Sequence, residues 1–220
     1  MGPPVMRSSL SPRSALMALA TSLVTAVSLA GGAALVQAAT PASLRVQVVD
    51  EAGLPVRDAV VELHSAKGVA GPIRFAWKMG IAQKNQQFTP GTLVVAKGST
   101  VAFPNLDNVR HSIYSFSKPA RFEIDLYGRD QTRTQSFPIT GSVKLGCNIH
   151  DQMRGYIRVT DTPYAAKTDH NGYVTLSGMA SGSAKLTIWH PQLRSPTGES
   201  KSAITITGGA QSQKLKVAVR

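Results

Sequence analysis

The chain has 220 residues, a formal net charge of +12 at pH 7 and a single cysteine, Cys147. One cysteine excludes a framework of internal disulfides. The basic residues form no run of five or six and are not interleaved with aromatic side chains, so the sequence does not indicate a nucleic-acid-binding surface. The positive charge instead favours solubility and partners with acidic surfaces.

Residues 1–39 have the three parts of a secretory signal peptide. Two arginines precede the apolar stretch Ala15–Ala30, and the small-residue sequence "VQAAT" follows it. We expect cleavage near Ala38 or Ala39 through the general secretory route, because no adjacent pair of arginines is present. An uncleaved membrane anchor is the alternative, but threonine, serine and glycine dilute the hydrophobicity of the segment. The protein is therefore expected in the periplasm, without stable membrane insertion once the signal is removed.

After the signal peptide, the sequence predicts an all-β protein. Residues 43–65 alternate apolar and polar side chains on both sides of the turn "AGLPV", a pattern typical of a β-hairpin. The stretch 66–87 has no clear pattern and is interpreted as a loop with one short strand. Further short runs, separated mostly by Gly, Pro, Asn or Asp, are predicted strands: "TLVVAKG", "STVAFPN", "HSIYSFS", "RFEIDL", "GSVKLGC", "GYIRVTD", "GYVTLSG", "SAKLTIWHP", "SAITITGG" and "QKLKVAVR".

The stretch "GCNIHDQMR" contains the lone cysteine, Cys147, together with His150 and Met153. In an oxidising compartment, a cysteine without a partner in its own chain forms an intermolecular disulfide, is a buried inert thiol, or serves as a ligand or nucleophile. Here a turn between two predicted strands can direct a thiolate, an imidazole and a thioether at one point. Thiolate and imidazole suit copper or zinc, whereas the thioether favours copper, and two histidines, one cysteine and a distant methionine form the blue-copper arrangement. A second histidine is therefore predicted.

His111 is the preferred candidate for this second histidine. It begins a predicted strand after a Pro-Asn-Asp turn, so it can approach the ligand loop from a neighbouring strand end. For the other three histidines a structural or surface role is favoured. His64 ends the first hairpin, His170 lies in the polar turn "TDHNG", and His190 precedes a proline.

The stretches "QQFTPGTLVVAKGSTVAFPNLDNVRHSIYSF" and "GSVKLGCNIHDQMRGYIRV" resemble a cupredoxin. The Cys-x-x-His-x-x-Met spacing is similar to that of amicyanin, with a shorter ligand loop than in plastocyanin. The mature chain more closely resembles periplasmic cupredoxin-domain proteins of proteobacteria, often labelled methylamine utilization protein or plastocyanin-like. This resemblance implies one copper ion in a type 1 site, with His111, Cys147, His150 and Met153 as ligands. The sequence departs from amicyanin at Asp151, where a proline commonly follows the second histidine.

The flanking segments "VQVVDEAGLPVRDAVVEL" and "AAKTDHNGYVTLSGMASGSAKLTIWHP" resemble parts of a carboxypeptidase-regulatory or transthyretin-like β-sandwich. We therefore expect an N-terminal hairpin segment at 41–75, a Greek-key cupredoxin sandwich at 76–160 and a carboxypeptidase-regulatory-like segment at 161–220. Two arrangements are open. Either 41–75 pairs with 161–220 in a discontinuous sandwich, or it belongs to the cupredoxin and the C-terminal segment forms a small sandwich of its own.

The resemblance implies a one-electron carrier in which His150, on the outer loop, is the electron port. Ser112 and backbone N–H groups near the site can hydrogen-bond the Cys147 sulfur and shift its potential. Arg110 and Arg154 flank the ligands and either attract an acidic partner or are ordinary solvated charges. A redox partner with an acidic patch, such as a c-type cytochrome or a dehydrogenase, fits the first interpretation.

Catalysis is not expected from this sequence. It has no His-x-His pair of a multicopper oxidase and no Cys-x-x-Cys-His haem attachment site. A Cys-His hydrolase would leave Met153 without a role and would expose its nucleophile to oxidation. Two alternatives to electron transfer are open: a protein that delivers, stores or senses copper, and a non-catalytic binding module.

Overall fold

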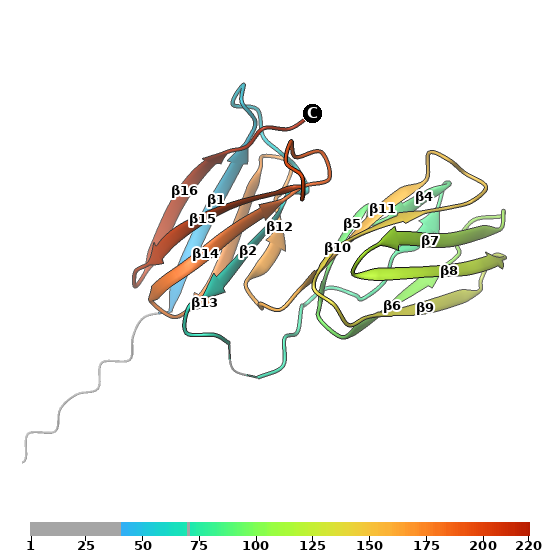
Figure 1. The fold of residues 1–220 in the computed structure, drawn as a ribbon, viewed down its shortest axis with the longest axis horizontal. Coiled ribbons are helices and arrows are strands. Elements are labelled where there is room, and N and C mark those ends of the chain that lie inside the picture. Colours follow the sequence, from blue (N-terminus) through green and yellow to red (C-terminus); the bar gives the residue numbers. More distant parts are fainter. Residues whose placement is uncertain (1–40, 70) are drawn as a thin grey trace, which may run out of the picture. The chain divides into compact units, whose positions relative to one another are not determined.

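The computed structural model describes residues 41–69 and 71–220, which form sixteen β-strands and no helix (Figure 1). The all-β class expected from the sequence is confirmed. All the described residues belong to one compact unit. No helix in this described part is long and apolar enough to cross a membrane. The expected signal peptide lies outside the described residues.

One β-sandwich combines strands from the two ends of the described chain. Its first sheet has the order β13-β1-β16, and its second has the order β12-β2-β14-β15. Both strands of the N-terminal segment pair with C-terminal strands and lie in different sheets, so the hairpin expected at 43–65 is wrong: β1 and β2 face each other across the sandwich instead of pairing. The bounds are β1 (Ala42–Val49), β2 (Val60–Ser65), β12 (Ala165–Lys167), β13 (Tyr173–Met179), β14 (Gly182–Trp189), β15 (Glu199–Ile206) and β16 (Ala210–Lys216).

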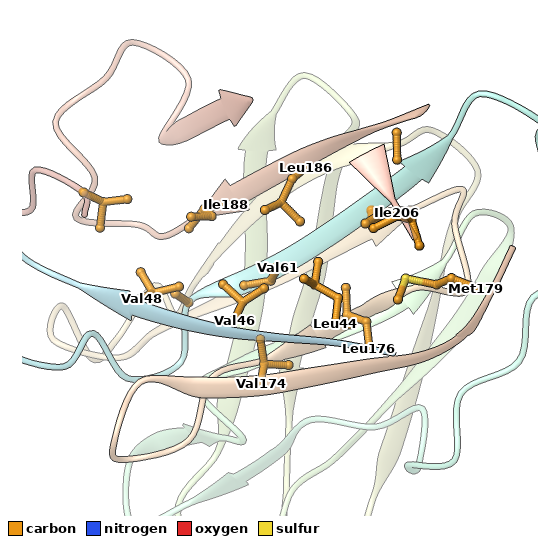
Figure 2. Packing of buried hydrophobic residues seen from close by; sticks show 14 of the residues in the cluster. Leu44, Val46, Val48, Val61, Val174, Leu176, Met179, Leu186, Ile188 and Ile206 are labelled. Atoms are coloured by element: carbon orange, nitrogen blue, oxygen red, sulfur yellow. The ribbon is translucent and has the colours of Figure 1, made fainter. Parts of the chain in front are cut away.

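The core of this sandwich follows from the period-two pattern of β1. Leu44, Val46 and Val48 are fully buried, because alternate side chains of a strand point to the same face of the sheet. Figure 2 shows these side chains facing Val61 of β2 and Leu186 of β14. Burial of this apolar face holds the two sheets together.

A second sandwich is built from the central part of the chain. Its larger sheet has the order β5-β11-β10-β7-β8, and its other layer contains the pairs β3-β4 and β6-β9. A parallel bridge between Gln83 and Asn105 links these two pairs. The bounds are β3 (Ala82–Lys84), β4 (Gln87–Thr89), β5 (Thr92–Ala96), β6 (Ser99–Pro104), β7 (His111–Ser117), β8 (Ala120–Tyr127), β9 (Thr132–Phe137), β10 (Gly141–Gly146) and β11 (Arg154–Thr160).

Three strands, β4, β9 and β12, were missed by the sequence patterns. β9 is mostly exposed, so its residues "TRTQSF" lack the alternation of a half-buried strand. β3 and β4 have only three residues each, and the positive φ angles of Asn85 and Gln86 form the tight turn between them. β12 is equally short. The short strand expected within 66–87 is β3, and the same stretch ends on the first residue of β4.

Candidate metal centre

The hairpin of β10 and β11 positions two of the four predicted ligands. Its last residue pair is Gly146 opposite Arg154, so Cys147 and Met153 are the next residues on the two sides of the hairpin mouth. Both are buried, with 3% and 1% of their surface exposed. The backbone N–H of Met153 donates to the carbonyl oxygen of His150 at 2.8 Å, which closes the turn between them.

His111 reaches the same place from the neighbouring strand. It is the first residue of β7, which pairs with β10 through Tyr114 and Gly146. The register of β7 against β8 shifts between His111 and Ile113. An irregularity of this kind re-aims side chains, and here His111, Ser112 and Ile113 are all buried in succession. His111 is completely excluded from solvent.

The three donor atoms of His111, Cys147 and His150 converge. The Cys147 Sγ atom lies 3.7 Å from Nδ1 of His111 and 3.7 Å from Nδ1 of His150. All three atoms lie within 4.8 Å of one another. The two imidazole rings, from separate segments of the chain, therefore present the same nitrogen to a single sulfur.

The two sulfur–nitrogen separations of 3.7 Å fit a metal ion bound to the sulfur and to either imidazole. Bonds of about 2.0 Å to nitrogen and about 2.3 Å to sulfur that meet at about 120° place the nitrogen and sulfur about 3.7 Å apart. The donor set of one soft sulfur and two imidazoles suits copper or zinc. The residues present are thus compatible with a bound transition-metal ion.

Met153 lies next to the three converging residues, whereas the other three histidines lie elsewhere. Met153 packs in the same buried core as Cys147. Outside this site, His64 pairs with Asp161 at 2.9 Å, His170 is exposed in its turn, and His190 is half-buried beside its own loop. The structure therefore brings together His111, Cys147 and His150, places Met153 in the adjoining core, and leaves the other histidines elsewhere.

Ser112 lies against the sulfur, as the sequence suggested. Its Oγ atom is 3.9 Å from the Cys147 Sγ atom and accepts a hydrogen bond from the backbone N–H of Asn148 at 3.0 Å. With that acceptor position used, the hydroxyl hydrogen of Ser112 can point toward the sulfur. Asn148 is itself held by Glu123 through a side-chain hydrogen bond of 2.9 Å.

Asp107 is a site residue that sequence reasoning missed. Its Oδ2 atom lies 2.8 Å from Nε2 of His111. Burial by itself raises the pKa of Asp107, but hydrogen bonds from the backbone of Gln86, from His111 and from the backbone of Asn85 lower it below its ordinary value. The only signal in the sequence is an aspartate four residues before His111, within a loop whose folding cannot be inferred from local pattern.

The outer side of the site is more exposed. His150 is the one partly exposed member of the three converging residues. Three apolar side chains nearby in sequence are also exposed. Ile149, next to His150, has 51% of its surface exposed, and Leu106 and Val109, in the loop before His111, have 48% and 41%. The two arginines singled out from the sequence, Arg110 and Arg154, are exposed as well.

Comparison with known proteins gives structural likenesses only. No family model matches the sequence, and no curated protein matches it. A Cu-containing nitrite reductase (NirK) from Thermus scotoductus SA-01 is similar over 43% of this chain, with 24% identity and a TM-score of 0.37; this chain spans 25% of its length. A purple cupredoxin from Nitrosopumilus maritimus is similar over 38% of this chain and 100% of its own, with 21% identity and a TM-score of 0.34. A reduced mutant of amicyanin is similar over 47% of this chain and 99% of its own, with 19% identity and a TM-score of 0.36.

Proposed function

We propose that this protein binds one copper ion between His111, Cys147 and His150, with Met153 as a fourth, weaker ligand, and serves as a one-electron carrier. The observation that carries this proposal is the position of the Cys147 sulfur, 3.7 Å from a ring nitrogen of each histidine. Zinc is compatible with the same three groups, but the thioether of Met153 adds little for zinc and favours copper. Copper held by these groups supplies one-electron exchange between its Cu(I) and Cu(II) states.

The surroundings of the ligands suit electron transfer because they limit movement. Cys147 and Met153 directly adjoin paired strands, and His111 begins a strand that is paired on both sides. Ligands held in this way reorganise little when the charge of the site changes. Burial of His111, Cys147 and Met153 keeps water from the inner side of the site.

His150 is the electron port in this proposal, because it alone among the converging residues reaches the surface. The exposed apolar side chains of Ile149 and Val109 would contact a partner there, and Arg110 and Arg154 would favour one with an acidic patch. A c-type cytochrome or a dehydrogenase of that character fits. We place this exchange in the periplasm, and the protein is then an electron carrier rather than an enzyme.

The test is the absorption spectrum and voltammetry of the purified protein with one equivalent of copper. Intense thiolate-to-copper absorption and a reversible redox couple are expected, and both should disappear in Cys147→Ser. His111→Ala should weaken the colour strongly. His64→Ala is the control and should leave the colour unchanged, because His64 pairs with Asp161 and is not one of the converging residues.

Other outcomes would point to other functions. A colourless protein that holds only Cu(I) would indicate copper delivery, storage or sensing. A protein that binds no copper would indicate a binding module. If His111→Ala keeps the full colour, His111 is not a ligand.

A further inference from the structure

We propose that Asp107 is a positioning residue for the metal centre: its carboxylate holds the proton of His111 on Nε2, directs Nδ1 toward the ion, and places a fixed negative charge behind the imidazole. This inference rests on the proposed copper-binding function. It concerns a residue that binds no metal itself and acts through the ligand it holds.

The two nitrogens of His111 face different groups. Nε2 lies 2.8 Å from Oδ2 of Asp107, while Nδ1 lies 3.7 Å from the sulfur of Cys147. A neutral imidazole has one N–H donor and one lone pair. A carboxylate can only accept, so the Nε2 atom must carry the hydrogen, and the lone pair is then on Nδ1, facing Cys147.

The carboxylate of Asp107 is itself firmly held. Its Oδ1 atom accepts from the backbone N–H of Asn85 at 2.5 Å, and its Oδ2 atom accepts from that of Gln86 at 2.9 Å. These two residues are the turn between β3 and β4, where both have φ of 55°. Each carboxylate oxygen therefore accepts a backbone hydrogen bond in addition to the contact with His111. The carboxylate cannot rotate away from the imidazole without losing a backbone donor.

Asn105, two residues before Asp107, also holds this loop in place. The backbone N–H of Asp107 donates to Oδ1 of Asn105 at 2.9 Å. The Asn105 side chain is fully buried and donates to the carbonyl oxygens of Tyr127 and Val109 at 3.0 and 2.9 Å. The position of Asp107 is thus set by the turn at Asn85 and Gln86 and by Asn105, which is itself held in place. Such placement is what a group needs to orient a ligand in the absence of the ion.

The expected chemical effect has a definite sign. A hydrogen bond from a ligand imidazole to a carboxylate raises the basicity of the ligating nitrogen, and loss of such a partner commonly lowers metal affinity about 10–100-fold. A negative charge stabilises Cu(II) more than Cu(I), because Cu(II) carries the larger positive charge. Asp107 should therefore lower the reduction potential of the site.

The first experiment compares Asp107→Asn with Asp125→Asn. Each replacement removes one carboxylate from the chain, but the Asp125 side chain is exposed on β8 and has no hydrogen-bond or ion-pair partner among the described residues. The affinities of each protein for Cu(II) and Cu(I) are measured with competing chelators, together with the reduction potential. Asp107→Asn should bind Cu(II) about 10–100-fold more weakly, with a smaller loss for Cu(I). Each tenfold difference between the two losses raises the potential by about 59 mV. If Asp107→Asn changes these values no more than Asp125→Asn does, the proposal is wrong.

The second experiment needs no copper and separates this inference from the proposed function. In the metal-free wild-type protein, the ¹⁵N NMR signals of the His111 ring should show the hydrogen on Nε2. In Asp107→Ala the hydrogen should be distributed between both nitrogens. A wild-type ring with its hydrogen on Nδ1 would overturn the inference, even if Asp107→Ala failed to fold. If no variant binds copper, the proposed function fails, and the ring signals alone decide whether Asp107 orients His111.

Discussion

Gly146, the last residue of β10, sets how closely Tyr114 can approach the residue beside Cys147. A Cβ atom at this glycine would lie 2.5 Å from Cζ and 2.7 Å from the hydroxyl oxygen of Tyr114. These distances are far inside van der Waals contact. The tyrosine ring of β7 can therefore cover the start of the ligand loop only because residue 146 has no side chain.

We predict that Gly146→Ala destabilises the protein by about 1–3 kcal/mol, as overpacking of a buried site does, and also alters the absorption of the copper-loaded form. Chemical denaturation and the visible spectrum measure the two effects. Gly91→Ala is the matched control, because a Cβ atom there meets no atom closer than 4.0 Å. Tyr114→Ala should relieve most of the loss in a double variant; a simple sum of the two single losses would show that the tyrosine ring is not the obstacle.

β11 has Met153 just before its first residue and an ion network near its other end. Arg158, with only 6% of its surface exposed, pairs with Glu62 of β2 at 2.5 Å and with Glu199 of β15 at 2.7 Å, and donates to Ser142 of β10 at 2.9 Å. A buried arginine of this kind is stable only while its partners remain in place. The strand that follows Met153 is therefore anchored by charges from two other strands and by a hydroxyl from a third.

We predict that Arg158→Met destabilises the protein by about 3–5 kcal/mol, because Glu62 is left as an uncompensated buried charge. Lys201→Met is the control: Lys201 pairs with the same Glu199 at 2.6 Å but is half exposed, so its loss should cost less than about 1 kcal/mol. Urea denaturation of both variants measures the difference. Equal losses would show that burial of the arginine does not matter.

The same network predicts the response to acid. Burial alone raises the pKa of Glu199, but hydrogen bonds from Lys201 and Arg158 lower it below the ordinary value of 4.5. A carboxylate with a lowered pKa stabilises the folded state above its ordinary pKa, and this contribution is lost as the pH falls below it. The wild-type protein should therefore lose stability below pH 4.5, and Arg158→Met should lose less over the same range. A parallel decline would exclude this network as the source.

At the scale of the whole molecule, metal binding and folding are linked. The converging donors come from β7 and from the loop between β10 and β11, and the distance from His111 to Cys147 along the chain is 36 residues. An unfolded chain does not hold such groups together. An ion bound by all of them therefore stabilises the folded state selectively.

We predict that copper at a free concentration about a hundredfold above its dissociation constant raises the free energy of unfolding by about 2.7 kcal/mol. A chelator should reverse the gain, and Cys147→Ser should show much less of it. Thermal unfolding with and without copper measures the shift. An equal rise in melting temperature in Cys147→Ser would mean that copper stabilises the protein from some other site.

Local sequence patterns were sufficient to predict most of the strands and the candidate ligands. Period-two alternation identifies β1, and strand-like runs mark β5 to β8 and β10, because such patterns reflect half-buried or buried pleats. The spacing of Cys147, His150 and Met153 predicts a ligand turn for an equally local reason: all three lie within seven residues between two strands. The choice of His111 rested on its place at a predicted strand start.

Long-range contacts decided the rest. The sequence left open whether 41–75 pairs with 161–220, and only the structure gives β1 and β2 their partners β12, β13, β14 and β16. Strand pairing depends on which faces are buried together after the chain returns. The hydrogen bond of Asp107 to His111 depends on a turn at Asn85 and Gln86, some twenty residues earlier in the chain. Side chains from separate segments meet only when the sheets have formed. A pattern read along the chain therefore identifies candidate ligands, whereas the folded structure identifies the residues that hold them.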